Sequence, residues 1–153
     1  MRRQSGFTLI ELITVIVILG ILSAFALPRF AGLEAQARSA SLDGLGGSVR
    51  SGAALAHAVW LAAGNKPTTV TMEGVTIRMD ATTGYPTAAN NGIRLVLQSL
   101  DGYTTGGVAG GYRFGVSGAT VASCNVVYQL GTGAGVPPTV TVTNNRITGG
   151  DCS

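Results

Sequence analysis

The sequence predicts an α+β fold in which a long N-terminal helix, hydrophobic in its first half, packs against an antiparallel β-sheet. An almost uncharged apolar run near the N-terminus continues into an amphipathic pattern, which predicts the helix. The second half is rich in Thr, Val and Gly, with turn residues between short apolar stretches, which predicts the strands. Of the 153 residues 46% are hydrophobic and only 11% charged, against about 25% charged in an ordinary soluble domain. This composition excludes a charged disordered tail, a coiled coil and a typical cytosolic enzyme.

The apolar run extends from Phe7 to Leu27 and contains one charged residue, Glu11. A helix of that length spans about 32 Å, which matches a hydrocarbon core of about 30 Å. Arg2 and Arg3 lie just before the run, and basic residues on one short flank favour a cytoplasmic location for that flank. We therefore expect a single pass through the inner membrane, with the N-terminus in the cytoplasm and the remaining chain on the far side.

Four interpretations of this segment remain open from the residues alone. A secretory signal peptide would use a small-residue site at Ala24-Phe25-Ala26, but that template does not explain Glu11. A twin-arginine address would use Arg2-Arg3, but nothing else of that pattern follows. The other two are a plain membrane anchor, which would tolerate Glu11 near the interface, and a prepilin leader with its helix.

The residues Gly6-Phe7-Thr8-Leu9-Ile10-Glu11, followed by the apolar run, favour the last interpretation. This segment resembles the type IV pilin and pseudopilin family. The resemblance implies that a prepilin peptidase and N-methyltransferase cuts after Gly6 and methylates the new terminal Phe7. It also implies three parts: a leader (residues 1–6), a transmembrane and assembly helix (7–28), and a periplasmic or extracellular globular domain (29–153) that includes the amphipathic half of the helix. The fold is then pilin-like.

Glu11 is costly in an apolar segment, by roughly 2–3 kcal/mol on insertion scales. In a bundle of such helices its carboxylate can pair with the terminal amine of a neighbouring copy, and such a pair fixes register more than it adds stability. We therefore expect Glu11 to be an assembly residue. Gly20 and Pro28 are candidate helix breaks, because both residue types disfavour a helix interior. One interpretation is a bend where the membrane ends. The resemblance implies that the stretch between Gly20 and Pro28 loses helical form in an assembled fibre.

The helical pattern continues to about Ala63, although four glycines between Gly44 and Gly52 weaken it. Beyond it we expect a hairpin at Glu73-Gly74 between strands 69–72 and 75–79, and a short helix at 93–100. Further strands are expected at 112–117, 124–130 and 139–143, then a turn at Asn144-Asn145 before residues 146–148. Residues 102–111 and 131–138 are expected to be exposed loops, and Gly84-Tyr85-Pro86 to start another.

Cys124 and Cys152 are the two cysteines of the chain. In an exported domain such a pair usually forms a disulfide, and free thiols or a redox role remain the alternative. The family resemblance also implies a C-terminal region bounded by a disulfide and exposed on the fibre, and the positions of Cys124 and Cys152 match it.

A second resemblance, to pilins of the mannose-sensitive haemagglutinin branch, is carried by scattered residues over about half of the chain. It implies a major structural pilin involved in surface attachment. These residues are Pro28-Arg29-Phe30, Leu33, Ala37-Arg38, Leu42, Gly44-Leu45 and Gly84-Tyr85-Pro86.

Residue patterns for catalysis, metal binding or cofactor binding are lacking, so we expect neither an enzyme nor a cofactor. The single histidine, His57, lies beside Trp60 on the expected helix and is interpreted as a packing residue. No metal-ligand spacing, nucleophile elbow or phosphate loop is present. Nucleic-acid binding is not indicated, because the formal charge is only +3 and falls to +1 without Arg2 and Arg3.

We therefore expect the major subunit of a type IV pilus, a homopolymer of identical chains used for adhesion, with motility or DNA uptake as further roles. The chain would lie in the inner membrane before assembly by the pilus machinery, and afterwards in the surface fibre. The alternative is the major pseudopilin of a type II secretion system, a periplasmic piston. That branch typically relies on bound calcium, so Cys124 and Cys152 favour the pilus. A minor pilin that captures DNA or sugars is a third possibility.

Overall fold

The computed structural model describes residues 7–119, 124–144 and 152, which divide between two compact units, Met1–Ala35 and Gln36–Ser153. The first element, α1 (Leu9–Ala63), confirms the predicted long helix and its continuity between Gly44 and Gly52. It ends before Gly64, whose φ of 71° lies in the left-handed region that glycine adopts without steric penalty. The α+β class is confirmed.

Gly20 and Pro28 do not interrupt α1 in this structure, so the expected break is absent from the single chain. A glycine costs a helix interior about 1 kcal/mol and a proline about 3 kcal/mol. The two positions are separated by residues that favour helix, and helix formation is cooperative over a run of this length. Loss of helical form in an assembled fibre stays a prediction.

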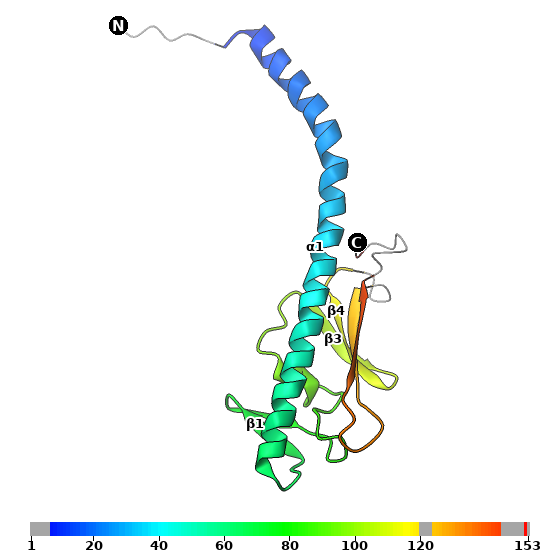
Figure 1. Cartoon of the computed structure of the whole chain (residues 1–153). Coiled ribbons are helices and arrows are strands. Elements are labelled where there is room, and N and C mark those ends of the chain that lie inside the picture. Colours follow the sequence, from blue (N-terminus) through cyan, green and yellow to red (C-terminus); the bar gives the residue numbers. More distant parts are fainter. Residues whose placement is uncertain (1–6, 120–123, 145–151, 153) are drawn as a thin grey trace, which may run out of the picture. The chain divides into compact units, whose positions relative to one another are not determined.

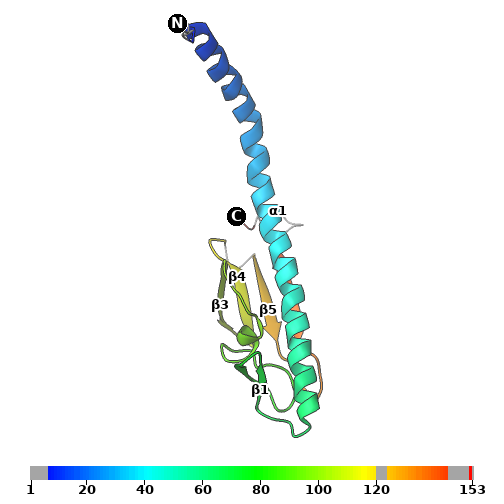
Figure 2. The ribbon, with the colours of Figure 1, turned by 90° about the vertical axis from the view of Figure 1, so that its left-hand side faces the viewer.

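The second unit contains a four-stranded antiparallel sheet in the order β3-β4-β5-β6, so each strand pairs with its neighbour in sequence. Its strands are β3 (Tyr103–Val108), β4 (Gly111–Val116), β5 (Cys124–Gln129) and β6 (Thr139–Asn144). The part of α1 in this unit lies along one face of the sheet (Figures 1 and 2). Three of these strands confirm the prediction. The expected turn and strand after Asn144 lie outside the described residues.

Two expectations for this unit were wrong. Residues 102–111, expected to be a loop, contain strand β3, because all six of its residues pair with β4 despite the weak strand preference of Gly106 and Gly107. The expected helix at 93–100 is only a 3₁₀ turn, η1 (Ile93–Val96). It ends because Leu97 adopts extended backbone angles, with φ −96° and ψ 126°.

A separate hairpin, β1 (Thr69–Met72) and β2 (Val75–Arg78), confirms the predicted turn at Glu73-Gly74. Both turn residues have positive φ, 48° and 81°, as a two-residue type I′ turn requires. The hairpin belongs to a small apolar cluster with the end of α1. Its buried members are Ala56, Trp60, Val70, Ile77 and Met79.

The main core lies between α1 and the sheet. Gly46 allows β6 to pack closely on α1, because a Cβ atom there would lie 2.5 Å from Val142 Cγ2. Gly52 does the same for η1, because a Cβ atom there would overlap Val96 Cγ1. The buried members of this core are Leu42, Leu45, Val49, Ala53, Ile93, Tyr112, Phe114, Cys124, Val126, Tyr128 and Cys152.

Candidate functional site

The first unit presents an uncovered apolar helix. Every large apolar side chain from Leu9 to Leu27 is at least 46% exposed. By length and composition α1 is able to cross a membrane. So much exposed apolar surface is unfavourable in water, at about 25 cal/mol per Å², so this segment requires lipid or other apolar helices around it.

Thr8 and Glu11 form a capping box at the start of α1. The Thr8 backbone N–H and hydroxyl donate to Glu11 Oε2 at 2.9 and 2.7 Å, and the Glu11 N–H is 3.4 Å from Thr8 Oγ1. Such reciprocal bonds satisfy helix-end donors that would otherwise lack partners. Sequence reasoning missed this role of Thr8, although the Thr-x-x-Glu spacing of residues 8–11 signals it.

The cap holds the Glu11 carboxylate one turn from Phe7, whose side chain is 88% exposed. Gly6 and the arginines before it lie outside the described residues. The structure therefore places Phe7 and Glu11 together at one end of the apolar helix. No salt bridge to Glu11 occurs within the part of the chain that the structure describes, and its observed partner is Thr8.

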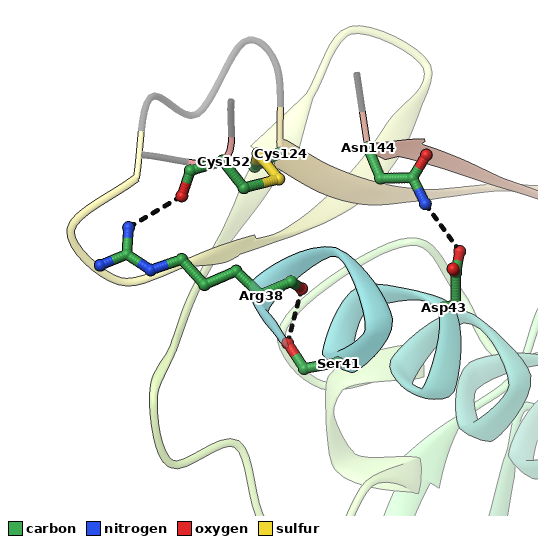
Figure 3. Close-up of a disulfide and its surroundings, with 6 residues drawn as sticks. All are labelled: Arg38, Ser41, Asp43, Cys124, Asn144 and Cys152. Carbon is green, nitrogen blue, oxygen red and sulfur yellow. Dashed lines mark hydrogen bonds between the residues drawn. A yellow bond between two sulfur atoms is a disulfide. The ribbon is translucent and has the colours of Figure 1, made fainter. Parts of the chain in front are cut away.

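The second feature is the Cys124–Cys152 disulfide, with Cα atoms 5.4 Å apart and both residues buried. It joins the start of β5 to the C-terminal region beside α1 (Figure 3). Arg38 Nη1 donates to the Cys152 carbonyl at 2.9 Å, and Asn144 Nδ2 donates to Asp43 Oδ1 at 2.8 Å. Two side chains of α1 thus hold Asn144 and Cys152 in place.

The loop that begins at Gly84-Tyr85-Pro86 has a structural role. His57 Nδ1 donates to the Gly84 carbonyl at 2.7 Å, and its ring stacks on Tyr85 with centroids 4.1 Å apart. A Cβ atom at Gly84 would lie 2.6 Å from a ring carbon of Trp60. The interpretation of His57 as a packing residue is confirmed, and Gly84 and Tyr85 of the motif are explained by packing against α1.

Asp80 anchors the same loop, because its Oδ1 accepts the N–H groups of Thr83 at 2.7 Å and Thr82 at 3.1 Å. The Thr83 N–H, the larger cause, holds the pKa of Asp80 below its usual value, with the Thr82 N–H adding to the effect. Because the pKa is lower in the folded protein, the charged carboxylate stabilises the fold above the unfolded pKa of about 4. That contribution is lost as the pH falls through the folded pKa.

We predict that Asp80→Asn weakens the acid dependence of stability. Asparagine keeps an acceptor oxygen but does not titrate, so the free energy of unfolding should fall less steeply below about pH 4 than in the wild type. Asp80→Ala, which removes the acceptor, should lower stability by about 1 kcal/mol even at neutral pH. Urea unfolding followed by fluorescence of Trp60 at several pH values measures both. Equal acid dependence of Asp80→Asn and wild type would contradict the prediction.

Within the described ranges no group of three or more His, Cys, Asp or Glu side chains is placed to hold a metal ion. The grooves of the second unit include one of about 420 Å³ between the hairpin and η1, lined by Leu55, Val75, Leu95 and Leu97 among others. Its lining brings together no nucleophile and base.

Comparison with known proteins matches the N-terminal part of the chain. The model of the prokaryotic N-terminal methylation motif matches residues 1–27. The type IV narrow pilus major component PilA5 of Thermus thermophilus is 56% identical over 54 residues, which are 35% of this chain and 47% of that protein. The type II secretion system core protein G of Vibrio cholerae is 51% identical over 37 residues, 24% of this chain and 25% of that protein. No solved structure matches the chain significantly.

The chain thus spans about half the length of one of these relatives and a quarter of the other. The methylation motif and both matches support the type IV pilin family, which is a family of structural proteins. They agree with the resemblance found in the sequence.

Proposed function

Because the chain carries the N-terminal region of a type IV pilin, we propose that it is the major structural subunit of a type IV pilus. It polymerises through the helix of residues 7–28 into a surface fibre used for adhesion. The match to the major component of a narrow pilus supports this role. The finer resemblance to mannose-sensitive haemagglutinin pilins remains part of the proposal.

One observation carries the proposal. The apolar side chains of the helix are not covered by the rest of the described chain, and the first turn of the helix contains a carboxylate, Glu11. All large apolar side chains of residues 9–27 are exposed, so the chain by itself leaves this surface uncovered. Lipid covers it before assembly, and the helices of other copies cover it in the fibre. Glu11 then distinguishes the two states, because an ion pair with a neighbour's terminal amine is available only among helices.

Processing and location follow from the same segment. In this proposal residues 1–6 are a leader with a cytoplasmic N-terminus, and the prepilin peptidase cuts between Gly6 and Phe7 and methylates Phe7. The processed chain waits in the inner membrane until the assembly machinery adds it to the fibre. Residues 29–153 form the globular domain outside the membrane, and the chain has no catalytic role.

The second candidate function is the major pseudopilin of a type II secretion system, a short periplasmic piston. The match to core protein G supports it, but over fewer residues than the pilus match. The buried Cys124–Cys152 disulfide favours the pilus, because the pseudopilin branch typically relies on bound calcium rather than on a cysteine pair.

Intact mass together with imaging tests the proposal. The exported protein should begin at Phe7, carry one added methyl group, and gain two hydrogens on reduction of its disulfide. Immunolabelling against the second unit should mark long fibres on the cell surface. A start at Leu27 would indicate a signal peptide and overturn the proposal, and a processed chain confined to the periplasm would favour the pseudopilin.

A further inference from the structure

The two edges of the four-stranded sheet differ in how they are protected. At β6, Arg50 Nη2 of α1 donates to the Val140 carbonyl at 2.8 Å, and Asp43 accepts from Asn144 at the end of the strand. At the other edge, β3 reads Tyr-Thr-Thr-Gly-Gly-Val and contains no charge and no proline. Natural sheets commonly use Lys, Pro or bulges to prevent pairing at an open edge. Figure 2 shows β3 as the outermost strand on its side of the sheet.

The register identifies which backbone groups of β3 point outward. Ser117 N–H donates to the Gly102 carbonyl at 2.9 Å, so these residues form a hydrogen-bonded pair at the start of the β3–β4 ladder. Bonded and non-bonded pairs alternate in an antiparallel ladder. The backbone groups that bond to β4 are therefore those of Thr104, Gly106 and Val108. The backbone N–H and C=O groups of the residues between them point away from β4.

The outward residues are Tyr103, Thr105 and Gly107. The Tyr103 N–H donates to the Leu100 carbonyl at 3.0 Å. For Thr105 and Gly107, no described residue outside β4 bonds to the backbone N–H or C=O. The Thr105 N–H and C=O, the Gly107 N–H and the Tyr103 C=O are therefore the groups that an added antiparallel strand would bond.

We propose that this edge pairs with the same edge of a second copy of the chain, antiparallel, with Thr105 on the two-fold axis. Thr105 then exchanges two hydrogen bonds with the partner's Thr105. The Gly107 N–H donates to the partner's Tyr103 carbonyl, and the partner's Gly107 N–H donates to the Tyr103 carbonyl. The contact then has four backbone hydrogen bonds.

The side chains of β3 fit this self-pairing. Tyr103 lies opposite the partner's Gly107, an arrangement in which an aromatic ring covers an edge glycine. Thr105 lies opposite the partner's Thr105, a favourable cross-strand pair. Thr104 faces the partner's Gly106, where a Cβ atom added to the glycine would meet no other atom within 4 Å. The register places no like charges opposite each other, since the nearest carboxylate, Asp101, falls opposite the partner's Ala109.

A two-fold contact of this kind closes on two copies and does not propagate along a polar fibre. If the chain is a pilus subunit, as proposed above, the contact therefore joins subunits of two different fibres and gives lateral association. The pairing itself does not depend on fibre assembly, so the two proposals are tested separately.

A cross-linking experiment on the purified full chain in detergent tests the register. Thr104 and the partner's Gly106 form a non-bonded pair, with Cα atoms about 4.5 Å apart, within the range of roughly 4.4–6.8 Å typical of disulfides. Thr104 is exposed and Gly106 has open space, so Thr104→Cys and Gly106→Cys should both fold. The native cysteines are already bonded to each other and buried.

We expect disulfide-linked dimers when the two variants are mixed, and few dimers from either variant alone. Adding Thr105→Pro to both, which removes an outward N–H and leaves the β3–β4 bonds intact, should abolish the cross-link. Trp60 fluorescence checks that this variant folds. No dimer in the mixture, or equal dimer from either variant alone, would overturn the pairing. Dimers in detergent with no fibres on cells would overturn the pilus function alone.

Discussion

Glu11→Gln is expected to leave the chain in the membrane and to abolish fibres. Glutamine is acceptable at this position of a capping box, so the contact with Thr8 is retained and the charge alone is removed. In lipid the neutral side chain is easier to bury than the carboxylate. In a helix bundle, loss of one partner of a buried ion pair costs about 3–5 kcal/mol, which is a drop of more than about 100-fold in the association constant.

Sheared surface fractions and membrane fractions, probed for the same chain, measure this effect. The matched control is Glu34→Gln. Glu34 is the next acidic residue of the helix after Glu11 and lies outside residues 7–28, so this change should leave fibre yield unchanged. Thr8→Val separates the cap from the charge, because it removes the hydroxyl donor and keeps the carboxylate. Abundant fibres from Glu11→Gln would mean that Glu11 serves only as a cap.

The helix of the first unit could be predicted from the sequence because the residues that indicate it are close together in the chain. The spacing of Gly6, Phe7 and Glu11 and the long apolar run predict a helix and its environment without any tertiary contact. The cap by Thr8 was not predicted, because the charge of Glu11 alone does not indicate a hydroxyl donor three residues before it. The absence of a break at Pro28 follows from cooperativity along the helix, which a residue-by-residue propensity does not include.

The strands of the second unit could be predicted where turn residues or alternation mark them, as at Glu73-Gly74 and in β6. β3 was missed because its Gly106-Gly107 pair resembles a loop, and only pairing with β4 makes it a strand. The roles of Gly46 and Gly52 depend on Val142 and Val96, which lie far away in sequence. Contacts between distant segments are the information that a single sequence does not provide.

Removal of the disulfide by Cys124→Ser with Cys152→Ser is expected to be the most destabilising change in the second unit. The bond closes a loop across a sequence separation of 28 residues, and restriction of the unfolded chain by such a loop contributes about 3–4 kcal/mol. Residue 152, whose carbonyl accepts from Arg38, would also lose its covalent link to the start of β5. For a unit of this size the unfolding midpoint should fall by roughly 10 °C or more.

Trp60 makes this loss measurable in the full chain, because it is the single tryptophan and is buried in the second unit against the hairpin. Its fluorescence reports unfolding of that unit while the apolar helix remains in detergent. Wild-type protein treated with reductant should shift to the same midpoint as the double variant. Arg38→Gln, which removes the bond to the Cys152 carbonyl and keeps the disulfide, should lower stability by only about 1–3 kcal/mol. If the double variant unfolds at the wild-type midpoint, the contacts of Arg38 and Asp43 with this region are sufficient without the covalent bond.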